Sequence, residues 1–194
     1  PPPAKTARKT TSNLNLNPFP LSLSLSPFPP LLIPELFEEA HARDPHRLDD
    51  ADTYSNVLYV RDDGPGLAAL ARSAAATDKF SAPAAIAAGN FFSLRGDHAR
   101  AVGAFRRALA LAPPPSSASG VGGPGGGAWT LLGHEFVELQ NPAAAVDAYR
   151  RAVDASPGDY RAWYGLGQAY ELLHLPHHAL WYYRRAAGLR PPAA

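Results

Sequence analysis

Three histidines, His174, His177 and His178, come closest in this sequence to the spacing of a metal site. They lie on both sides of Pro176, and no carboxylate accompanies them at a spacing typical of zinc ligands. The chain contains no cysteine, which excludes disulfides, a catalytic thiol and thiolate metal sites. We therefore expect a structural or surface role for these histidines, and we predict no metal site.

Other patterns that could support catalysis are equally weak. Residues 122–127 are rich in glycine, but no Lys-Ser or Lys-Thr pair follows and no strand is expected before them, as a phosphate-binding loop requires. The acidic pairs Asp49–Asp50 and Glu38–Glu39 are expected at solvated helix starts and faces. We predict no catalytic residue and no cofactor, and hence a protein that is not an enzyme.

The most regular feature of the chain is a repeat. Eight positions recur after 34 residues: Trp129, Leu132, Gly133, Phe136, Ala145, Tyr149, Ala152 and Pro157 return as Trp163, Leu166, Gly167, Tyr170, Ala179, Tyr183, Ala186 and Pro191. This is the pattern of the tetratricopeptide repeat (TPR), in which two helices joined by a turn form one unit. We expect the small residues to let the two helices cross closely, and the aromatic residues of the first helix to share a buried stripe.

Weaker copies precede these two units, so the whole chain can be divided. We predict a disordered tail at 1–30, the second helix of a truncated TPR at 31–47, a divergent TPR at 48–81, TPRs at 82–115, 126–159 and 160–193, and a Gly/Ser/Pro insertion at 116–125. The predicted packing residues are Gly89, Phe92, Ala101, Phe105, Trp129, Gly133, Phe136, Ala145, Tyr149, Trp163, Gly167, Tyr170, Ala179 and Tyr183. Asp97 and Asn141 are expected to cap second helices, whereas Leu175 offers no capping side chain. The predicted fold is all-α, a TPR solenoid wound as a right-handed superhelix.

Composition narrows the possible partners. The net charge is +1, which gives no reason to expect nucleic acid, and no apolar run is long enough to span a membrane. The chain begins at Pro1 and contains no methionine, so we expect a fragment, a processed product or an incomplete gene. Its first 30 residues are basic and lack acids, which is compatible with a targeting segment but is more simply a disordered tail.

Several strings agree with one TPR family beyond the repeat consensus. They are DTYSNVLYV at 52–60, GNFFSLRGDH at 89–98, AWTLLGHEFVE at 128–138, AVDAYRRAV at 145–153, DYRAWYGLGQAYELL at 159–173 and LWYYRRA at 180–186. On these residues the chain resembles subunit 8 of the anaphase-promoting complex (the cyclosome), a cell-division-cycle TPR family, over about residues 35–191.

The resemblance implies a non-catalytic scaffold subunit of a ubiquitin ligase that drives mitosis, located in the nucleus and cytoplasm. The implied partners are the other subunits of the complex and a short N-terminal motif of its coactivator. Family members pair as homodimers through N-terminal repeats, which are absent from this chain, so we do not expect that dimer. The insertion at 116–125 and the missing C-terminal repeats are further departures from the family.

A peptide is expected along the concave surface, which the first helix of each TPR lines. The predicted groove residues are Asn56, Asn90, Thr130, His134, Glu138, Arg161, Tyr164, Gln168 and Glu171. Four of them (Asn56, Asn90, His134 and Gln168) stand one per repeat and can both donate and accept hydrogen bonds, as an extended backbone requires. The acids would favour a segment that carries arginine. The alternative is that these polar side chains only solvate the surface.

Arginine pairs follow the aromatic residue of each second helix, at 106–107, 150–151 and 184–185. We expect them to be solvated on the outer surface, in preference to a contact with a neighbouring subunit. Two other functions remain open: a generic TPR adaptor such as a co-chaperone, which would need cations in the groove, and the TPR arm of a larger enzyme such as a glycosyltransferase.

Overall fold

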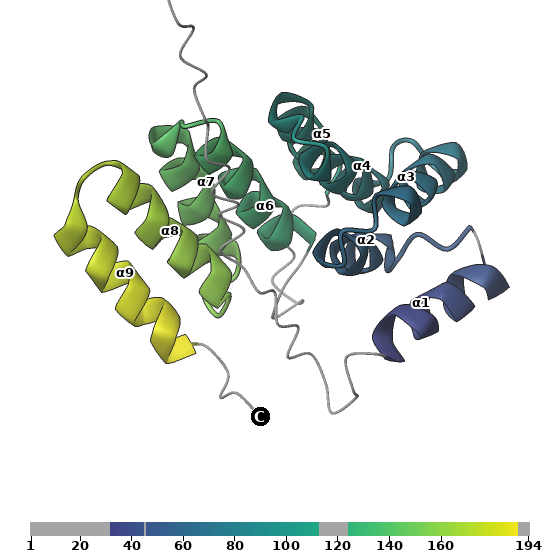
Figure 1. The fold of residues 1–194 in the computed structure, drawn as a ribbon, viewed down its shortest axis with the longest axis horizontal. Coiled ribbons are helices and arrows are strands. Elements are labelled where there is room, and N and C mark those ends of the chain that lie inside the picture. Colours follow the sequence, from purple (N-terminus) through teal and green to yellow (C-terminus); the bar gives the residue numbers. More distant parts are fainter. Residues whose placement is uncertain (1–31, 45, 113–123, 190–194) are drawn as a thin grey trace, which may run out of the picture.

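The computed structural model describes residues 32–44, 46–112 and 124–189, which form helices and short connections (Figure 1). The helices are α1 (Leu32–Arg43), α2 (Ala51–Val60), α3 (Gly64–Thr77), α4 (Ala82–Leu94), α5 (His98–Leu111), α6 (Pro124–Glu138), α7 (Pro142–Ala155), α8 (Tyr160–Leu172) and α9 (Pro176–Leu189). The described part of the chain has no strand, and the predicted all-α TPR solenoid is confirmed.

Helices pair as hairpins and the hairpins stack in chain order. The closest packing joins α4 to α5, α6 to α7 and α8 to α9, and the next closest joins α5 to α6 and α7 to α8. The first hairpin departs from this pattern, because α2 and α3 each pack more against α4 than against each other. Residues 1–30 and most of the predicted insertion at 116–125 lie outside the described residues, and α6 begins at Pro124, inside the range predicted for that insertion.

A left-handed residue ends the first helix of every hairpin. Asp62, Gly96, Gln140 and His174 have φ values of 57°, 73°, 55° and 59°, and they occupy equivalent positions of the four units. Each amide bonds back to the last turn, as His174 N does to the Glu171 carbonyl at 2.9 Å, which completes a helix cap. His174 is therefore a turn residue, which lies between the end of α8 and the start of α9 at Pro176.

Side-chain caps begin the second helices. Asp63 Oδ1 accepts a hydrogen bond from Gly66 N at 2.9 Å, Asp97 from Arg100 N at 3.2 Å and Asn141 from Ala144 N at 3.2 Å. The caps predicted at Asp97 and Asn141 are thus confirmed. These contacts satisfy amide groups that a helix leaves without partners at its first turn.

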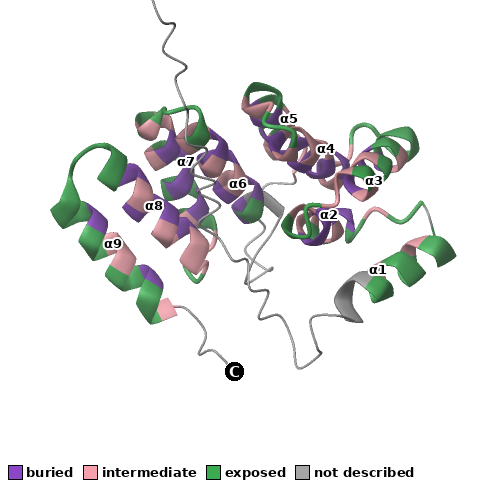
Figure 2. Ribbon diagram, viewed as in Figure 1, coloured by how far each residue is buried: buried purple, intermediate pink, exposed green. Residues whose placement is uncertain are grey.

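The buried residues lie where the hairpins meet (Figure 2). At the centre of each of the last three hairpins, the aromatic ring of the second helix packs onto a glycine of the first: Phe105 on Gly89, Tyr149 on Gly133 and Tyr183 on Gly167. A Cβ at Gly133 would lie 2.5 Å from Tyr149 Cε1. The expectation of a simple close crossing of backbones is corrected here, because the glycine makes room for a ring rather than for another backbone.

Candidate peptide-binding surface

The predicted groove residues all lie on first helices. Asn56 is on α2, Asn90 on α4, Thr130, His134 and Glu138 on α6, and Arg161, Tyr164, Gln168 and Glu171 on α8. Because first helices of successive hairpins also contact one another, α2 with α4, α4 with α6 and α6 with α8, these side chains form a continuous series. The series is not uniformly accessible, and its members differ in what they bind within the chain.

Asn90 joins two helices through hydrogen bonds and is not accessible to a peptide. Its side chain is buried, with 2% exposure, and its Nδ2 donates to Ser55 Oγ and to Asn56 Oδ1, both at 2.8 Å. Ser55 Oγ donates in turn to the Asp52 carbonyl at 2.7 Å. The expectation that Asn90 presents free donors to a peptide is corrected, because its amide is already used to join α4 to α2.

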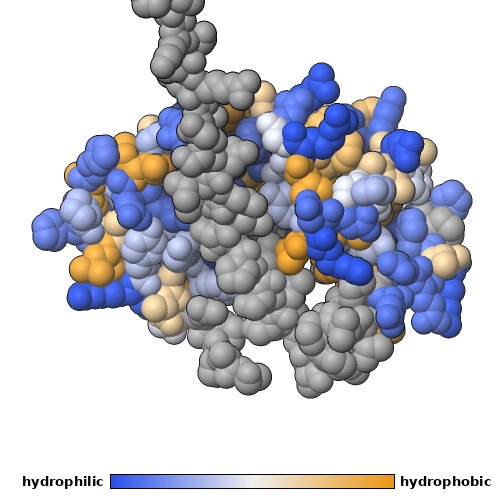
Figure 3. All heavy atoms as spheres, viewed as in Figure 1, coloured by the Kyte–Doolittle hydropathy of each residue, from blue (hydrophilic) through white to orange (hydrophobic). Residues whose placement is uncertain are grey.

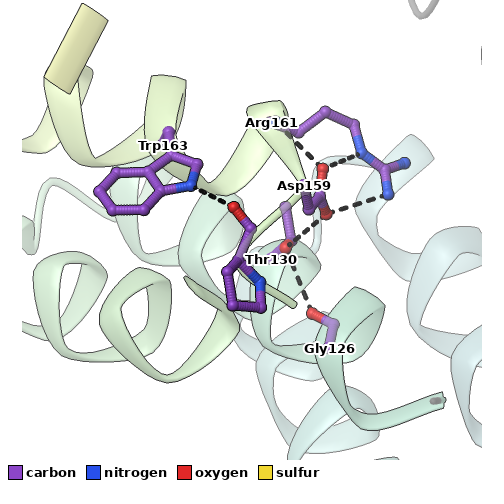
Figure 4. A network of polar contacts seen from close by, with 6 residues as sticks. Gly126, Thr130, Asp159, Arg161 and Trp163 are labelled. Carbon is purple, nitrogen blue, oxygen red and sulfur yellow. Dashed lines mark hydrogen bonds and ion pairs between the residues drawn. The ribbon is translucent and has the colours of Figure 1, made fainter. Parts of the chain in front are cut away.

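Thr130 is likewise buried, at the junction of α6 and α8 (Figure 4). Its Oγ1 lies 3.2 Å from the Gly126 carbonyl oxygen and 3.4 Å from Asp159 Oδ2. Asp159 also accepts from Arg161, whose Nε and a terminal nitrogen lie 2.9 and 3.1 Å from its two oxygens. The Arg161 side chain is half-buried, and its hydrogen bonds to the Asp159 carboxylate fix the guanidinium at the start of α8.

His134 lies between the inner surface and the core. Its Nδ1 is 2.7 Å from Tyr149 Oη, and the two rings meet edge to face with centroids 5.4 Å apart. Burial, and to a smaller extent the nearby Arg161, lowers the pKa of His134 from its ordinary value of 6.5 to about 4, while Asp159 opposes the shift. The imidazole is therefore neutral at neutral pH, and burial keeps the Tyr149 hydroxyl protonated by raising its pKa.

A buried carboxylate that sequence reasoning missed joins three helices near the middle of the solenoid. Glu135 on α6, only 4% exposed, accepts a hydrogen bond from Ser93 Oγ of α4 at 2.6 Å and lies 2.9 Å from His98 Nδ1 of α5. Burial raises the pKa of Glu135, and the contacts with Ser93 and His98 oppose that rise. The only signal in the sequence was an acid inside the apolar stripe between Gly133 and Phe136.

The most exposed members of the series lie at the ends of α6 and α8, and partly exposed ones lie on α2 and α8. Glu138 and Glu171 are exposed, while Asn56, Tyr164 and Gln168 are partly exposed. Glu171 accepts from the Tyr183 hydroxyl at 2.7 Å, and the Tyr164 and Tyr183 rings lie 5.1 Å apart. This surface offers two carboxylates, two amides and a phenol, which suit hydrogen bonding and attraction of cations rather than covalent chemistry.

The arginine pairs pack over aromatic rings in a repeated way. The second arginine covers the tryptophan of its own unit: Arg151 over Trp129 at 4.9 Å and Arg185 over Trp163 at 5.5 Å. The first reaches the next unit, where Arg150 donates to Tyr170 Oη at 2.6 Å. These side chains are exposed, as expected, but they also bind rings of the solenoid itself.

Two negative findings apply to the described ranges. No group of three His, Cys, Asp or Glu in them is placed to hold a metal ion. None of their helices is long and apolar enough to cross a membrane.

On the face shown in Figure 3, hydrophilic residues predominate and hydrophobic ones reach the surface in small groups.

Comparisons with known proteins agree with the repeats. The tetratricopeptide repeat family matches residues 130–194. Anaphase-promoting complex subunit 8 of Arabidopsis thaliana is 48% identical over 109 residues, which is 56% of this chain and 17% of that protein. Anaphase-promoting complex subunit CDC23 of Saccharomyces cerevisiae is 43% identical over 111 residues, covering 57% of this chain and 16% of that protein. The chain thus spans less than a fifth of either relative.

A solved structure shows the same fold. The crystal structure of the APC/C hetero-tetramer Cut9-Hcn1 superposes with a TM-score of 0.72, covering 82% of this chain and 29% of that one, at 18% identity. At this identity the match supports the solenoid architecture alone. The chain therefore has a TPR fold, and over 109 and 111 residues it is similar to stretches of anaphase-promoting complex subunit 8 and of subunit CDC23.

Proposed function

We propose that this chain is a non-catalytic TPR scaffold of an anaphase-promoting complex, the ubiquitin ligase of mitosis, and that it binds neighbouring subunits through its stacked hairpins. The observation that carries the proposal is identity of 48% over 109 residues with anaphase-promoting complex subunit 8 of Arabidopsis thaliana, which is more than the few consensus positions of each TPR would supply.

The inner surface is proposed to receive an extended peptide, such as the N-terminal motif of a coactivator. Because Asn90 and Thr130 are buried, the contacts would come from Glu138, Gln168 and Glu171, with the partly exposed Asn56 and Tyr164 beside them. The two carboxylates favour a segment that carries arginine, and Gln168 can pair with peptide groups of either kind.

Fluorescence anisotropy with a labelled coactivator peptide tests the surface. Glu138→Gln with Glu171→Gln removes two exposed negative charges from it, and we expect affinity to fall about threefold to tenfold, less at high salt. Asp147→Asn with Asp154→Asn removes two exposed charges from α7 and is the matched control, expected to bind as the unaltered chain does. Equal affinity of all three proteins would refute the proposed surface.

Assembly is tested separately. We expect the chain to co-purify with recombinant anaphase-promoting complex subunits prepared without subunit 8, and a fluorescent fusion to be found in nucleus and cytoplasm. Failure to co-purify would contradict the scaffold role, whatever the outcome with the peptide. Preferential binding of a peptide through its terminal carboxylate would instead favour a co-chaperone adaptor.

A further inference from the structure

A hollow of about 430 Å³ opens on the surface between α3, α4 and α5. Its walls are mainly apolar, with Ala85, Ala88 and Phe92 from α4 and Gly103 and Ala104 from α5. Three cations, Lys79, Arg100 and Arg107, stand around it. The volume lies within the range of about 300–1,000 Å³ that is usual for ligand sites, although this hollow is open on one side.

The last hairpin has a smaller hollow, of about 260 Å³, in the equivalent place. Repeat positions 85, 103 and 104 correspond to 163, 181 and 182, where the chain has Trp163, Trp181 and Tyr182. These three rings pack together, with centroids 6.0 Å apart for Trp163 and Trp181 and 4.8 Å apart for Trp181 and Tyr182. Alanine, glycine and alanine replace them around the hollow between α3, α4 and α5, which at about 430 Å³ is larger than the hollow of about 260 Å³ that the rings leave in the last hairpin.

The cations around the hollow complete the comparison. Arg107 is equivalent to Arg151 and Arg185, whose guanidinium groups cover tryptophan rings at 4.9 and 5.5 Å. Because Ala85 offers no ring, Arg107 lies instead over Phe80, at 5.9 Å, and Phe80 is 63% exposed. Arg107 also donates a hydrogen bond to the Lys79 carbonyl at 2.6 Å, so it would have to turn from Phe80 to cover an aromatic ring that entered the hollow.

The positive charges around the hollow indicate which residues of a partner should lie next to an aromatic ring bound there. Arg100 pairs with Asp97 at 3.3 Å, while Lys79 and Arg107 form no ion pair with any described residue. We propose that the hollow between α3, α4 and α5 binds one aromatic side chain of a partner protein, carried on an acidic segment. The ring occupies the space left by Ala85, Gly103 and Ala104, and flanking carboxylates meet Lys79 and Arg107.

The test uses the full chain and a fluorescein-labelled peptide, Gly-Asp-Glu-Trp-Glu-Asp-Gly, followed by anisotropy. We expect saturable binding, at least about tenfold weaker when the peptide tryptophan is alanine or its acids are lysine. Gly103→Trp supplies a ring from the chain itself, at an exposed site where an added Cβ meets nothing within 4 Å, and should abolish binding. Gly188→Trp on α9 is the matched control, since its Cβ also meets nothing within 4 Å.

Arg107→Glu gives a second variant that does not depend on filling the hollow, and it should also weaken binding by about tenfold, while Arg184→Glu should not. Far-UV circular dichroism establishes that each variant is folded. Lack of saturation up to about 1 mM protein, or Gly103→Trp binding as the unaltered chain does, would overturn the proposal. So would a self-association that Gly103→Trp abolishes in the absence of peptide binding, because the occupant would then be a second copy.

Discussion

The contact between Gly133 and Tyr149 predicts that Gly133→Ala destabilises the protein when the Tyr149 ring is present and stabilises it when the ring is absent. A Cβ at Gly133 would lie 2.5, 2.6 and 2.7 Å from three atoms of the Tyr149 ring, which is fully buried. The ring cannot retreat, because Gly165 of the next first helix packs closely on it as well. Its hydroxyl is held by His134 at 2.7 Å. Gly133→Ala must therefore strain the hairpin.

The magnitude follows from two opposing effects. Alanine gains about 0.5–1 kcal/mol over glycine inside a helix. Overpacking of a rigid core costs about 1–3 kcal/mol, and the upper end applies where three ring atoms are too close. We therefore expect Gly133→Ala to lower the free energy of unfolding by about 1–2 kcal/mol. When Tyr149→Ala removes the ring, the clash is absent and Gly133→Ala should stabilise the protein by up to about 1 kcal/mol.

Urea unfolding of the four proteins in this cycle, followed by far-UV circular dichroism, measures the coupling. Gly188→Ala is the control, because a Cβ there meets nothing within 4 Å, and it should be stabilising in either background. A change of the same sign and size for Gly133→Ala with and without the tyrosine ring would refute the reasoning. The coupling energy is expected at about 2–3 kcal/mol.

Three further predictions concern the caps and the buried ionisable groups. Leu175→Asn should add the cap that α9 lacks and raise the free energy of unfolding by about 1 kcal/mol. The lowered pKa of His134 means that the folded state binds fewer protons than the unfolded one, so stability present above pH 6.5 should be lost as the pH falls toward 4. The loss is about 2–3 kcal/mol, and His134→Gln should lack it. The raised pKa of Glu135 has the opposite effect on stability. The stability that protonated Glu135 contributes is present below the ordinary pKa of 4.5 and is lost as the pH rises through the higher pKa of the folded state. The stability of Glu135→Gln relative to the unaltered chain should therefore increase as the pH rises.

Unfolding titrations across pH measure the last two effects, and thermal melts measure the first. His177→Gln, at an exposed position on α9, is the control for the substitution itself. Parallel pH profiles for His134→Gln and the unaltered chain would contradict the effect ascribed to burial of that ring. A difference between Glu135→Gln and the unaltered chain that stays constant with pH would do the same for Glu135. An unchanged melt for Leu175→Asn would contradict the capping argument.

The candidate surface was only partly predictable. Repeat position alone placed Asn56, Gln168 and Glu171 on the first helices that line one side of the solenoid. It could not distinguish Gln168, which is partly exposed, from Asn90, which is buried against Ser55. Both occupy the same repeat position, and the difference comes from α2, the first helix of the preceding hairpin, which supplies a hydroxyl and an amide oxygen to Asn90.

The sequence by itself determined the helices, their hairpins and the caps, because helical period and capping depend on residues only a few positions apart. Tertiary structure decided which polar groups are buried and where a space stays open. Glu135 meets Ser93 across 42 residues, and the hollow beside Ala85 depends on three helices together. Such contacts join residues distant in the chain, so the local pattern that predicts each helix carries no information on what packs against it.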